Sequence, residues 1–362
     1  MSIKAHSITY TKHGTVFKDT LNLTEFTIDP EKLQPNQVIV ETLSSAINPS
    51  DLSAIRGGYA APNIQYLNAK EPVFIPGNEG VLRVSHVGSE VKNYKVGDWV
   101  VPRFSKFGTW RTHALVTIDK DEEPFILVSN DEDSLPVNEA GTIAINPPTA
   151  DQLVEFFVKD WKDDGNDWII QNSGNSQVSK FVTQFASLKN IKTISIVRDG
   201  KSDEEIKQLY DFGATKVFSE SEFSSEEFYT ETLPQLIGDK GRVRLALNSV
   251  GGKTVAGLVR SLSFNGIVVS YGVISGEPVT FDSKIQLYNN ITLSVYYLNF
   301  YPYTGAEKKV ESINKAVKLY KEGKLKDIPF TKAEYKKGDN LLEVFLAAID
   351  ASKKGKQVVV YS

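Results

Sequence analysis

The chain has 362 residues, of which 41% are hydrophobic and 10% aromatic, so it can bury the cores of about two domains and does not have a disordered composition. Its formal net charge is −4 and it has no strongly basic run, which argues against nucleic-acid binding. The lack of cysteine excludes disulfides, thiolate zinc sites and a cysteine nucleophile. The four histidines show no metal-ligand spacing, and no apolar run reaches the roughly 20 residues that span a bilayer.

Residues 1–145 are predicted to form a compact, β-barrel-like domain. Short runs of strand-forming residues begin at Val38, Gly80 and Trp99, and glycine-containing turns lie at 87–89 and 97–98. Many short strands separated by regularly spaced turns are typical of barrels and sandwiches. We therefore expect a mainly β unit at the start of the chain.

The stretch 167–199 predicts a βαβ unit of a dinucleotide-binding fold. Its apolar run at 168–170 indicates a buried parallel strand, and a turn of small polar residues follows at 172–176. Apolar residues then recur at helical spacing up to Leu188, and a second strand is predicted at 193–197. Because the turn leads into a helix N-terminus, free backbone N–H groups and the helix dipole would attract a phosphate there.

Further strand and helix patterns alternate up to about residue 295. Strands are predicted at 216–218, 243–247 and 266–271, followed by an edge-like strand at 293–298. Repeated βα units imply a parallel, doubly wound sheet, whose ligand crevice lies beyond the carboxyl ends of its strands. Four residues are expected at such ends: Asn172, Arg198, Asn248 and Tyr271.

Two features of this region bear on the cofactor. The turn keeps only Gly174 of the usual three-glycine pattern, so the fingerprint is weak by itself. Where NAD-binding folds usually place an acid that bonds the ribose, Arg198 precedes Asp199 here. A cation at this point suits the additional 2′-phosphate of NADP. The alternative interpretation is a solvated turn with ordinary surface charges.

Residues 296–362 are predicted to rejoin the first domain. We expect an amphipathic helix that includes Val310 and Val317, a second helix at 341–350 and a final strand at 357–361. The edge-like run 293–298 is rich in β-forming residues and poor in charges, which is a liability when exposed. We therefore expect a homodimer formed by pairing of these edges.

Three motifs resemble those of the medium-chain dehydrogenase/reductase superfamily. They lie at 46–51 (AINPSD), 77–80 (GNEG) and 96–100 (VGDWV). The resemblance implies an α/β protein with a GroES-like β-barrel catalytic domain at 1–145 and a Rossmann-type, NADP-binding domain at 146–295. The superfamily's zinc alcohol dehydrogenases have a ligand histidine where Asn78 stands, so a zinc-free member is implied. The segments 47–51, 56–59, 107–110, 170–172 and 247–253 are most similar to the fungal mitochondrial 2-enoyl thioester reductases, also called enoyl-[acyl-carrier-protein] reductases.

This resemblance implies the reduction of a trans-2-enoyl thioester, carried by acyl carrier protein or coenzyme A, with NADPH. It also implies that Tyr59 donates the proton, the alternative being a loop aromatic that packs on its own domain. The cofactor-binding residues that it implies are Asn146, Ser173, Gly174, Asn175, Ser176, Val197, Arg198, Asp199, Tyr271, Gly272, Val273, Ile274, Tyr296, Tyr297, Leu298, Asn299 and Lys356, with no metal. A solvated lysine is the alternative interpretation of Lys356.

The chain also departs from the family's pattern. Gly200 replaces a second arginine two places after Arg198, with Lys201 as a candidate substitute, and the segments 146–149, 271–274 and 296–299 differ. Two alternative functions therefore stay open: a zinc-free quinone or enone reductase, which would not need Tyr59, and a nucleotide-binding paralogue without catalysis. The resemblance implies the mitochondrial matrix. No presequence is visible, so the cytoplasm is the alternative location.

Overall fold

The computed structural model describes residues 1–58, 62–65, 67, 71–119, 123–129, 135–298 and 306–362, which form two compact units. Residues 1–145 and 309–362 make the first unit, and residues 146–308 make the second. We predicted the return to the first unit at residue 296, but it comes after Lys308. The segment after residue 295 stays with the second unit because Tyr296 donates hydrogen bonds to the Ser270 carbonyl (2.9 Å) and to Gln152 (2.8 Å).

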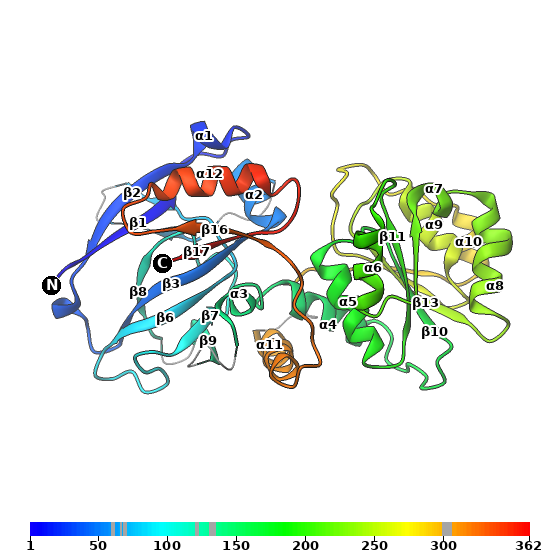
Figure 1. The fold of residues 1–362 in the computed structure, drawn as a ribbon, viewed down its shortest axis with the longest axis horizontal. Helices are drawn as coiled ribbons and strands as arrows, with labels where there is room; N and C mark the ends of the chain where they lie inside the picture. Colours follow the sequence, from blue (N-terminus) through cyan, green and yellow to red (C-terminus); the bar gives the residue numbers. More distant parts are fainter. Residues whose placement is uncertain (59–61, 66, 68–70, 120–122, 130–134, 299–305) are drawn as a thin grey trace. The chain divides into compact units, whose positions relative to one another are not determined.

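The first unit is built around a seven-stranded sheet whose central strand is β3 (Gln37–Ile47). Val38 and Val40 alternate along β3 and are fully buried in the barrel core, as a two-residue strand period requires. The sheet order is β16 (Thr331–Tyr335), β17 (Gln357–Tyr361), β3, β6 (Gly80–Val87), β7 (Trp99–Pro102) and β9 (Phe125–Ser129), with β8 (His113–Thr117) also paired to β3. Because β17 pairs with β3, the last strand of the chain lies within the sheet that residues 37–129 build (Figure 1).

A second core of the first unit lies between the hairpin of β1 (Ile3–Thr9) and β2 (Asn22–Ile28) and the helix α12 (Leu341–Ala351) (Figure 1). Trp110 stacks on Phe345 of α12, with ring centroids 4.6 Å apart. The shorter elements of this unit are α1 (Phe17–Thr20), η1 (Pro30–Lys32), α2 (Pro49–Arg56), β4 (Ile64–Gln65), β5 (Val73–Phe74) and α3 (Val137–Ala140). Helix α11 (Ala306–Lys321) begins within the second unit and continues into the first.

The second unit contains a six-stranded, fully parallel sheet. Its order is β12 (Lys216–Ser219), β11 (Lys192–Val197), β10 (Asp167–Gln171), β13 (Arg242–Asn248), β14 (Ile267–Ser270) and β15 (Thr292–Val295). The first strand in sequence, β10, lies in the middle, and the order reverses between β10 and β13. This order is that of the dinucleotide-binding doubly wound fold, whose ligand crevice lies at the reversal point.

Helices flank this sheet on both sides, with α5 and α6 on one side and α9 and α10 on the other (Figure 1). The helices are α4 (Asn146–Phe156), α5 (Gln177–Ser187), α6 (Asp203–Asp211), α7 (Glu220–Phe223), the π-helical η2 (Phe228–Thr232), α8 (Leu233–Ile237), α9 (Thr254–Ser261) and α10 (Ser283–Tyr288). Within the described ranges no helix is long and apolar enough to cross a membrane.

Candidate active site

The turn after β10 has the geometry of a phosphate-binding turn. Ser173 has a left-handed φ of +51°, and the Gly174 N–H donates to the Ile196 carbonyl at 2.7 Å. A Cβ on Gly174 would lie 2.7 Å from the Ser195 Cβ, so only glycine fits this close approach to β11. Ser176 caps α5 by accepting from the Ser179 N–H at 3.2 Å. The turn therefore presents the N-terminus of an 11-residue helix at the carboxyl edge of the sheet.

Two buried asparagines join the strand ends at the reversal point. Asn172 donates from Nδ2 to Asn248 Oδ1 at 2.8 Å, and its own Oδ1 accepts from the Ser249 N–H at 2.8 Å. Asn248 donates in turn to Ser270 Oγ at 2.9 Å. The ends of β10, β13 and β14 are thus cross-linked by side-chain amides. These two residues, which we expected at strand ends, act as supports of the turns around the crevice.

The end of β11 carries one free cation and one engaged carboxylate. Arg198 is exposed, and the described part of the chain provides it with no ion-pair or hydrogen-bond partner. Asp199 instead accepts from both the N–H (3.2 Å) and the hydroxyl (2.6 Å) of Ser221 in α7, and these bonds lower its pKa. Lys201, the candidate substitute for the second arginine, is paired with Glu205 at 2.7 Å. Arg198 is therefore the cation at this strand end that remains available to a ligand.

The segment 271–274 follows β14 at the same edge. Gly272 packs against β13's end, because a Cβ there would lie 2.8 Å from the Ser249 carbonyl oxygen. The Tyr271 hydroxyl lies 3.5 Å from Ser179 Oγ, and burial raises its pKa. Val273 and Ile274 leave two large apolar side chains exposed, at 69% and 67%. The segment thus has a closely packed glycine followed by two exposed apolar side chains, against which a planar ring of a ligand could pack.

The remaining predicted cofactor residues of the second unit are mostly buried. Tyr296 is buried, as are Leu298 and Asn146, the first residue of α4, while Tyr297 is half-buried. Asn299 lies outside the described residues. Tyr296 and Leu298 therefore form part of the packing of their own unit, and Tyr297 is the more accessible member of this set.

Tyr59 also lies outside the described residues, but the structure describes the segment that leads to it. Helix α2 ends at Arg56, whose guanidinium lies over the Phe17 ring at 4.8 Å. Gly57 has a left-handed φ of +85° and donates its N–H to the Ala54 carbonyl. Gly58 then donates to the Ser53 carbonyl at 2.9 Å. The direction in which the chain leaves α2 is therefore fixed up to Gly58.

A buried polar cluster surrounds Asn78, the residue that stands where the resemblance implied a zinc-ligand histidine in other members. Asn78 donates from Nδ2 to Asp51 Oδ1 at 2.7 Å and accepts from the Lys106 N–H at 2.8 Å. Lys356 donates to Asn48 Oδ1 at 2.5 Å and lies 3.4 Å from Glu79 Oε2. No group of three metal-ligating side chains occurs among the described residues. Amide groups and an ammonium thus satisfy the two carboxylates of this cluster.

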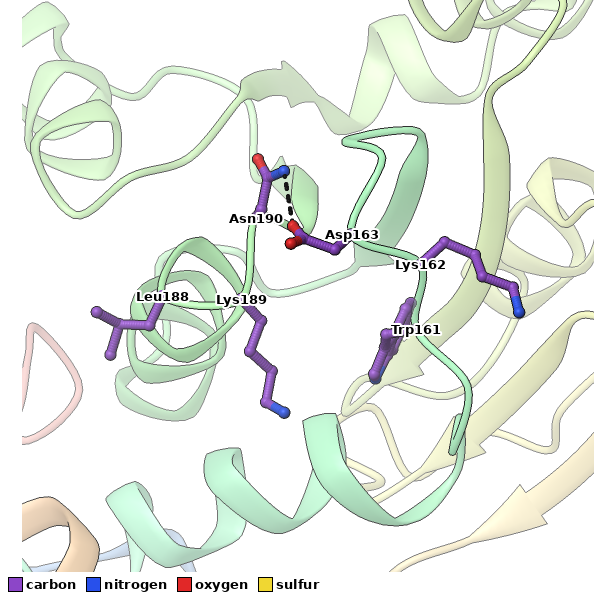
Figure 2. A pocket seen from close by; sticks show the side chains of 6 residues that line it. All are labelled: Trp161, Lys162, Asp163, Leu188, Lys189 and Asn190. Atoms are coloured by element: carbon purple, nitrogen blue, oxygen red, sulfur yellow. Dashed lines mark hydrogen bonds between the residues drawn. The ribbon is translucent and has the colours of Figure 1, made fainter.

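A shallow pocket of about 330 Å³ lies at the opposite, amino edge of the second unit's sheet (Figure 2). Its polar side chains are already paired: Lys189 with Glu155, Asn190 with Asp163, and the Trp161 indole N–H with the Val154 carbonyl. Lys162, which also lines it, is paired with Asp160. This pocket therefore presents paired groups, whereas the carboxyl edge presents the free Arg198.

Comparison with known proteins decides the family. The alcohol dehydrogenase GroES-like domain model matches residues 34–116. A Debaryomyces hansenii protein, mitochondrial enoyl-[acyl-carrier-protein] reductase 1, is 46% identical over 100% of both chains. The solved heterodimer of the mitochondrial 2-enoyl thioester reductase from Candida tropicalis is 37% identical, with a TM-score of 0.93 over 99% of this chain and 100% of that chain. The chain belongs to the mitochondrial enoyl-[acyl-carrier-protein] reductase family.

A further relative bears on the alternative function. The NADPH quinone oxidoreductase of Kluyveromyces marxianus is 36% identical and covers 89% of this chain and 83% of its own length. The comparisons confirm the predicted resemblance and fold class: a Rossmann-type sheet with a GroES-like unit.

Sequence reasoning missed several members of the buried cluster in this family member. Asn48, Asp51 and Glu79 lie in the motifs that carry the resemblance, but we assigned them no role. The signal was present in the sequence. Polar residues in short motifs that lie between apolar strands are expected to be buried, and buried polar side chains are expected to be paired. Lys309, also fully buried, has no comparable signal, because it lies on an ordinary amphipathic helix.

Asp51 makes the first unit's stability depend on pH. Burial raises its pKa to about 6 from an ordinary value of 3.8, despite hydrogen bonds from Asn48 and Asn78 that lower it. The folded state thus binds a proton on Asp51 more tightly than the unfolded state does. The resulting contribution to the free energy of unfolding is fully present below pH 3.8 and is lost as pH rises through about 6. The loss amounts to about 3 kcal/mol of unfolding free energy. Asp51→Asn should flatten the pH dependence of unfolding by denaturant across this window, and an unchanged profile would contradict the assignment.

Proposed function

We infer that the protein is an NADPH-dependent 2-enoyl thioester reductase. The observation that carries this inference is full-length similarity to enzymes of this activity, including a solved complex with NADP and crotonyl-CoA that is 37% identical over 99% of this chain. The residues present also fit a dinucleotide, because Gly174 allows close approach at the N-terminus of α5 and Arg198 is unpaired within the described chain. We assign the cofactor to the carboxyl edge of the second unit.

The cofactor supplies the hydride for the β-carbon of the enoyl group when it is bound. The protein must hold it, exclude water and deliver a proton to the α-carbon. We assign the pyrophosphate to the turn 173–176, the 2′-phosphate to Arg198 and the nicotinamide end to the segment 271–274. Lys356 remains a proposed contact whose ammonium, in the described structure, bonds Asn48 and lies near Glu79.

We assign the proton donor to Tyr59. A phenol with a pKa near 10 stays protonated at neutral pH and can therefore donate a proton. As the proton is transferred to the α-carbon, the negative charge that develops on the thioester is neutralised.

The direct test is an assay of NADPH oxidation with crotonyl-CoA and, separately, with a quinone. We expect rapid oxidation with crotonyl-CoA and little with the quinone. The second candidate function, quinone reduction, is favoured by the Kluyveromyces marxianus relative and predicts the reverse. A protein that binds NADPH but oxidises it with neither acceptor would support the paralogue without catalysis.

We also propose that two chains pair through β15. Val295 is 63% exposed at the end of this edge strand, and Leu287 and Tyr288 of α10 expose 73% and 75% of their surface. An edge strand with exposed apolar side chains is a template for strand pairing. The solved Candida tropicalis relative is itself a heterodimer.

Light scattering is expected to give about twice the chain mass of 40.2 kDa for the wild type. The double variant Leu293→Lys/Val295→Lys should give a monomer, because buried lysines at a strand-pairing edge carry unpaired charge. Leu188→Lys is the matched control, since it places the same charge on an exposed apolar residue of the same unit at the amino edge of the sheet. A monomeric wild type, or an edge variant that stays dimeric, would contradict this arrangement.

Because the curated relatives are named mitochondrial proteins, we propose the same compartment for this chain. Co-fractionation of the native protein with mitochondria tests this proposal, and recovery in the cytosolic fraction would contradict it.

A further inference from the structure

Glu79 connects three distant parts of the first unit and is fully buried, with 0% exposure. Its Oε1 accepts from the Ile145 N–H at 2.9 Å, and its Oε2 accepts from Asn48 Nδ2 at 2.9 Å and lies 3.4 Å from the Lys356 ammonium. Ile145 is the last residue before the chain first leaves this unit. We call the points at which the chain passes between the units crossings. The Glu79 carboxylate therefore binds the first crossing, 145–146, on the side of the first unit.

The second crossing, 308–309, is held by a buried amine. Lys309 is the first residue on the return to the first unit, is 2% exposed and donates to the carbonyls of Arg103 (3.0 Å) and Pro102 (3.5 Å). Burial lowers its pKa to about 8, and attraction to Glu79 opposes that shift. Glu79 thus bonds the first crossing directly, whereas backbone carbonyls of the first unit hold the second.

The same carboxylate is also linked to the start of α2. Asn48 precedes α2 and bonds Glu79 through Nδ2, and its N–H donates to Asp51 at 2.9 Å. Helix α2 leads directly to the segment that contains Tyr59. One buried acid therefore bonds both the residue that precedes α2 and the point at which the chain first leaves the first unit.

We propose that Glu79 is a positioning residue that fixes the first crossing segment and the start of α2 relative to one another, and thereby sets the rate of hydride and proton transfer. This inference rests on the proposed function, since it needs the proton donor that we assign to the segment after α2. A displacement of about 1 Å at a reacting centre can reduce the rate by about 10²-fold, so an anchor remote from the chemistry can control kcat.

The test compares Glu79→Gln with Asp167→Asn. Asp167 is a matched control: it is also a fully buried carboxylate that accepts from a backbone N–H (Lys162, 2.8 Å) and pairs with cations (Arg242, 2.6 Å), but it lies at the amino edge of the second unit's sheet. Both changes keep the side-chain shape and remove a buried charge. Both should therefore lower the melting temperature, because each leaves a cation less well paired: the buried Lys356 in one case and the half-buried Arg242 in the other.

The two variants should differ in turnover. With crotonyl-CoA, and per NADPH-binding site, Glu79→Gln should lower kcat by about 10- to 100-fold with a smaller change in KM, whereas Asp167→Asn should stay within about threefold of wild type. Asn48→Ala, which removes the bond from the start of α2 to Glu79, should also lower kcat. Its combination with Glu79→Gln should cost less than the product of the two effects, because the two side chains are bonded to each other.

Amide hydrogen exchange gives a readout that does not depend on activity. The Ile145 amide should exchange faster in Glu79→Gln and not in Asp167→Asn, and the signal is easily isolated because Pro147 and Pro148 carry no amide hydrogen. Unchanged Ile145 exchange, or a kcat for Glu79→Gln within about threefold of wild type, would overturn the proposal. If Glu79→Gln does not fold, Asn48→Ala decides by the same kcat criterion. A wild type that is inactive with crotonyl-CoA but turns over a quinone would refute the proposed substrate, and the same comparison of variants would then be made with the quinone.

Discussion

Tyr59→Phe is expected to lower kcat for crotonyl-CoA by about 10²–10⁴-fold, which is the usual cost of removing a positioned acid. The change removes one hydroxyl and keeps the ring, so the fold and the affinity for NADPH should stay as in wild type. The proton must then come from water, which is poorly placed and leaves the charge that develops on the thioester unneutralised for longer. Turnover with crotonyl-CoA and NADPH affinity, measured on the same preparations, test this expectation.

Tyr94→Phe is the matched control for this experiment. The Tyr94 hydroxyl also belongs to the first unit, but it donates to Glu123 (2.9 Å) and the Phe125 carbonyl (3.1 Å) beside the barrel strand β9. Its loss should reduce stability and leave kcat unchanged. If Tyr59→Phe binds NADPH normally and turns over within about threefold of wild type, Tyr59 is a packing residue and quinone reduction gains support.

The elements of the second unit could be predicted well because the sequence patterns that specify each of them lie close together in the chain. The apolar run 168–170, the small-residue turn and the helical spacing that follows lie within one short stretch, and each has a direct structural cause. Gly174 illustrates this, because its close approach to Ser195 depends on a strand that comes only about twenty residues later. The sheet order could then be expected from the repeated βα units.

Long-range pairing limited the prediction of the first unit and of the edge strand. Lys356 reads as one of several surface lysines, yet its side chain is 6% exposed and its partner Glu79 lies 277 residues earlier in the chain. Similarly, the run 293–298 looks like one continuous strand, but β15 ends at Val295 and Tyr296 turns into the core. Apolar periodicity cannot distinguish an exposed edge from a buried segment when both are hydrophobic.

The structure also refines the cofactor preference, because it separates three charges that the sequence places side by side. Asp199 is engaged by Ser221 and Lys201 by Glu205, whereas Arg198 is exposed and has no partner within the described residues. An acid that already accepts two hydrogen bonds is a poorer partner for a ribose hydroxyl. The only one of these three charges without a partner among the described residues is therefore positive, which favours a ligand with an additional negative charge.

Arg198→Ala is accordingly expected to weaken NADPH binding and to leave NADH binding nearly unchanged. A charge-assisted hydrogen bond is worth roughly 1.5–3 kcal/mol, which corresponds to about a 10- to 150-fold loss of affinity. Lys201→Ala is the matched control, and it should have a smaller effect because its ammonium is already paired at 2.7 Å with Glu205. Titration of both cofactors by fluorescence checks the result at low and moderate salt, since the contribution of an exposed cation falls as salt screens it. Equal losses for NADPH and NADH would show that Arg198 does not contact the 2′-phosphate, and a larger loss in Lys201→Ala would transfer that role to Lys201.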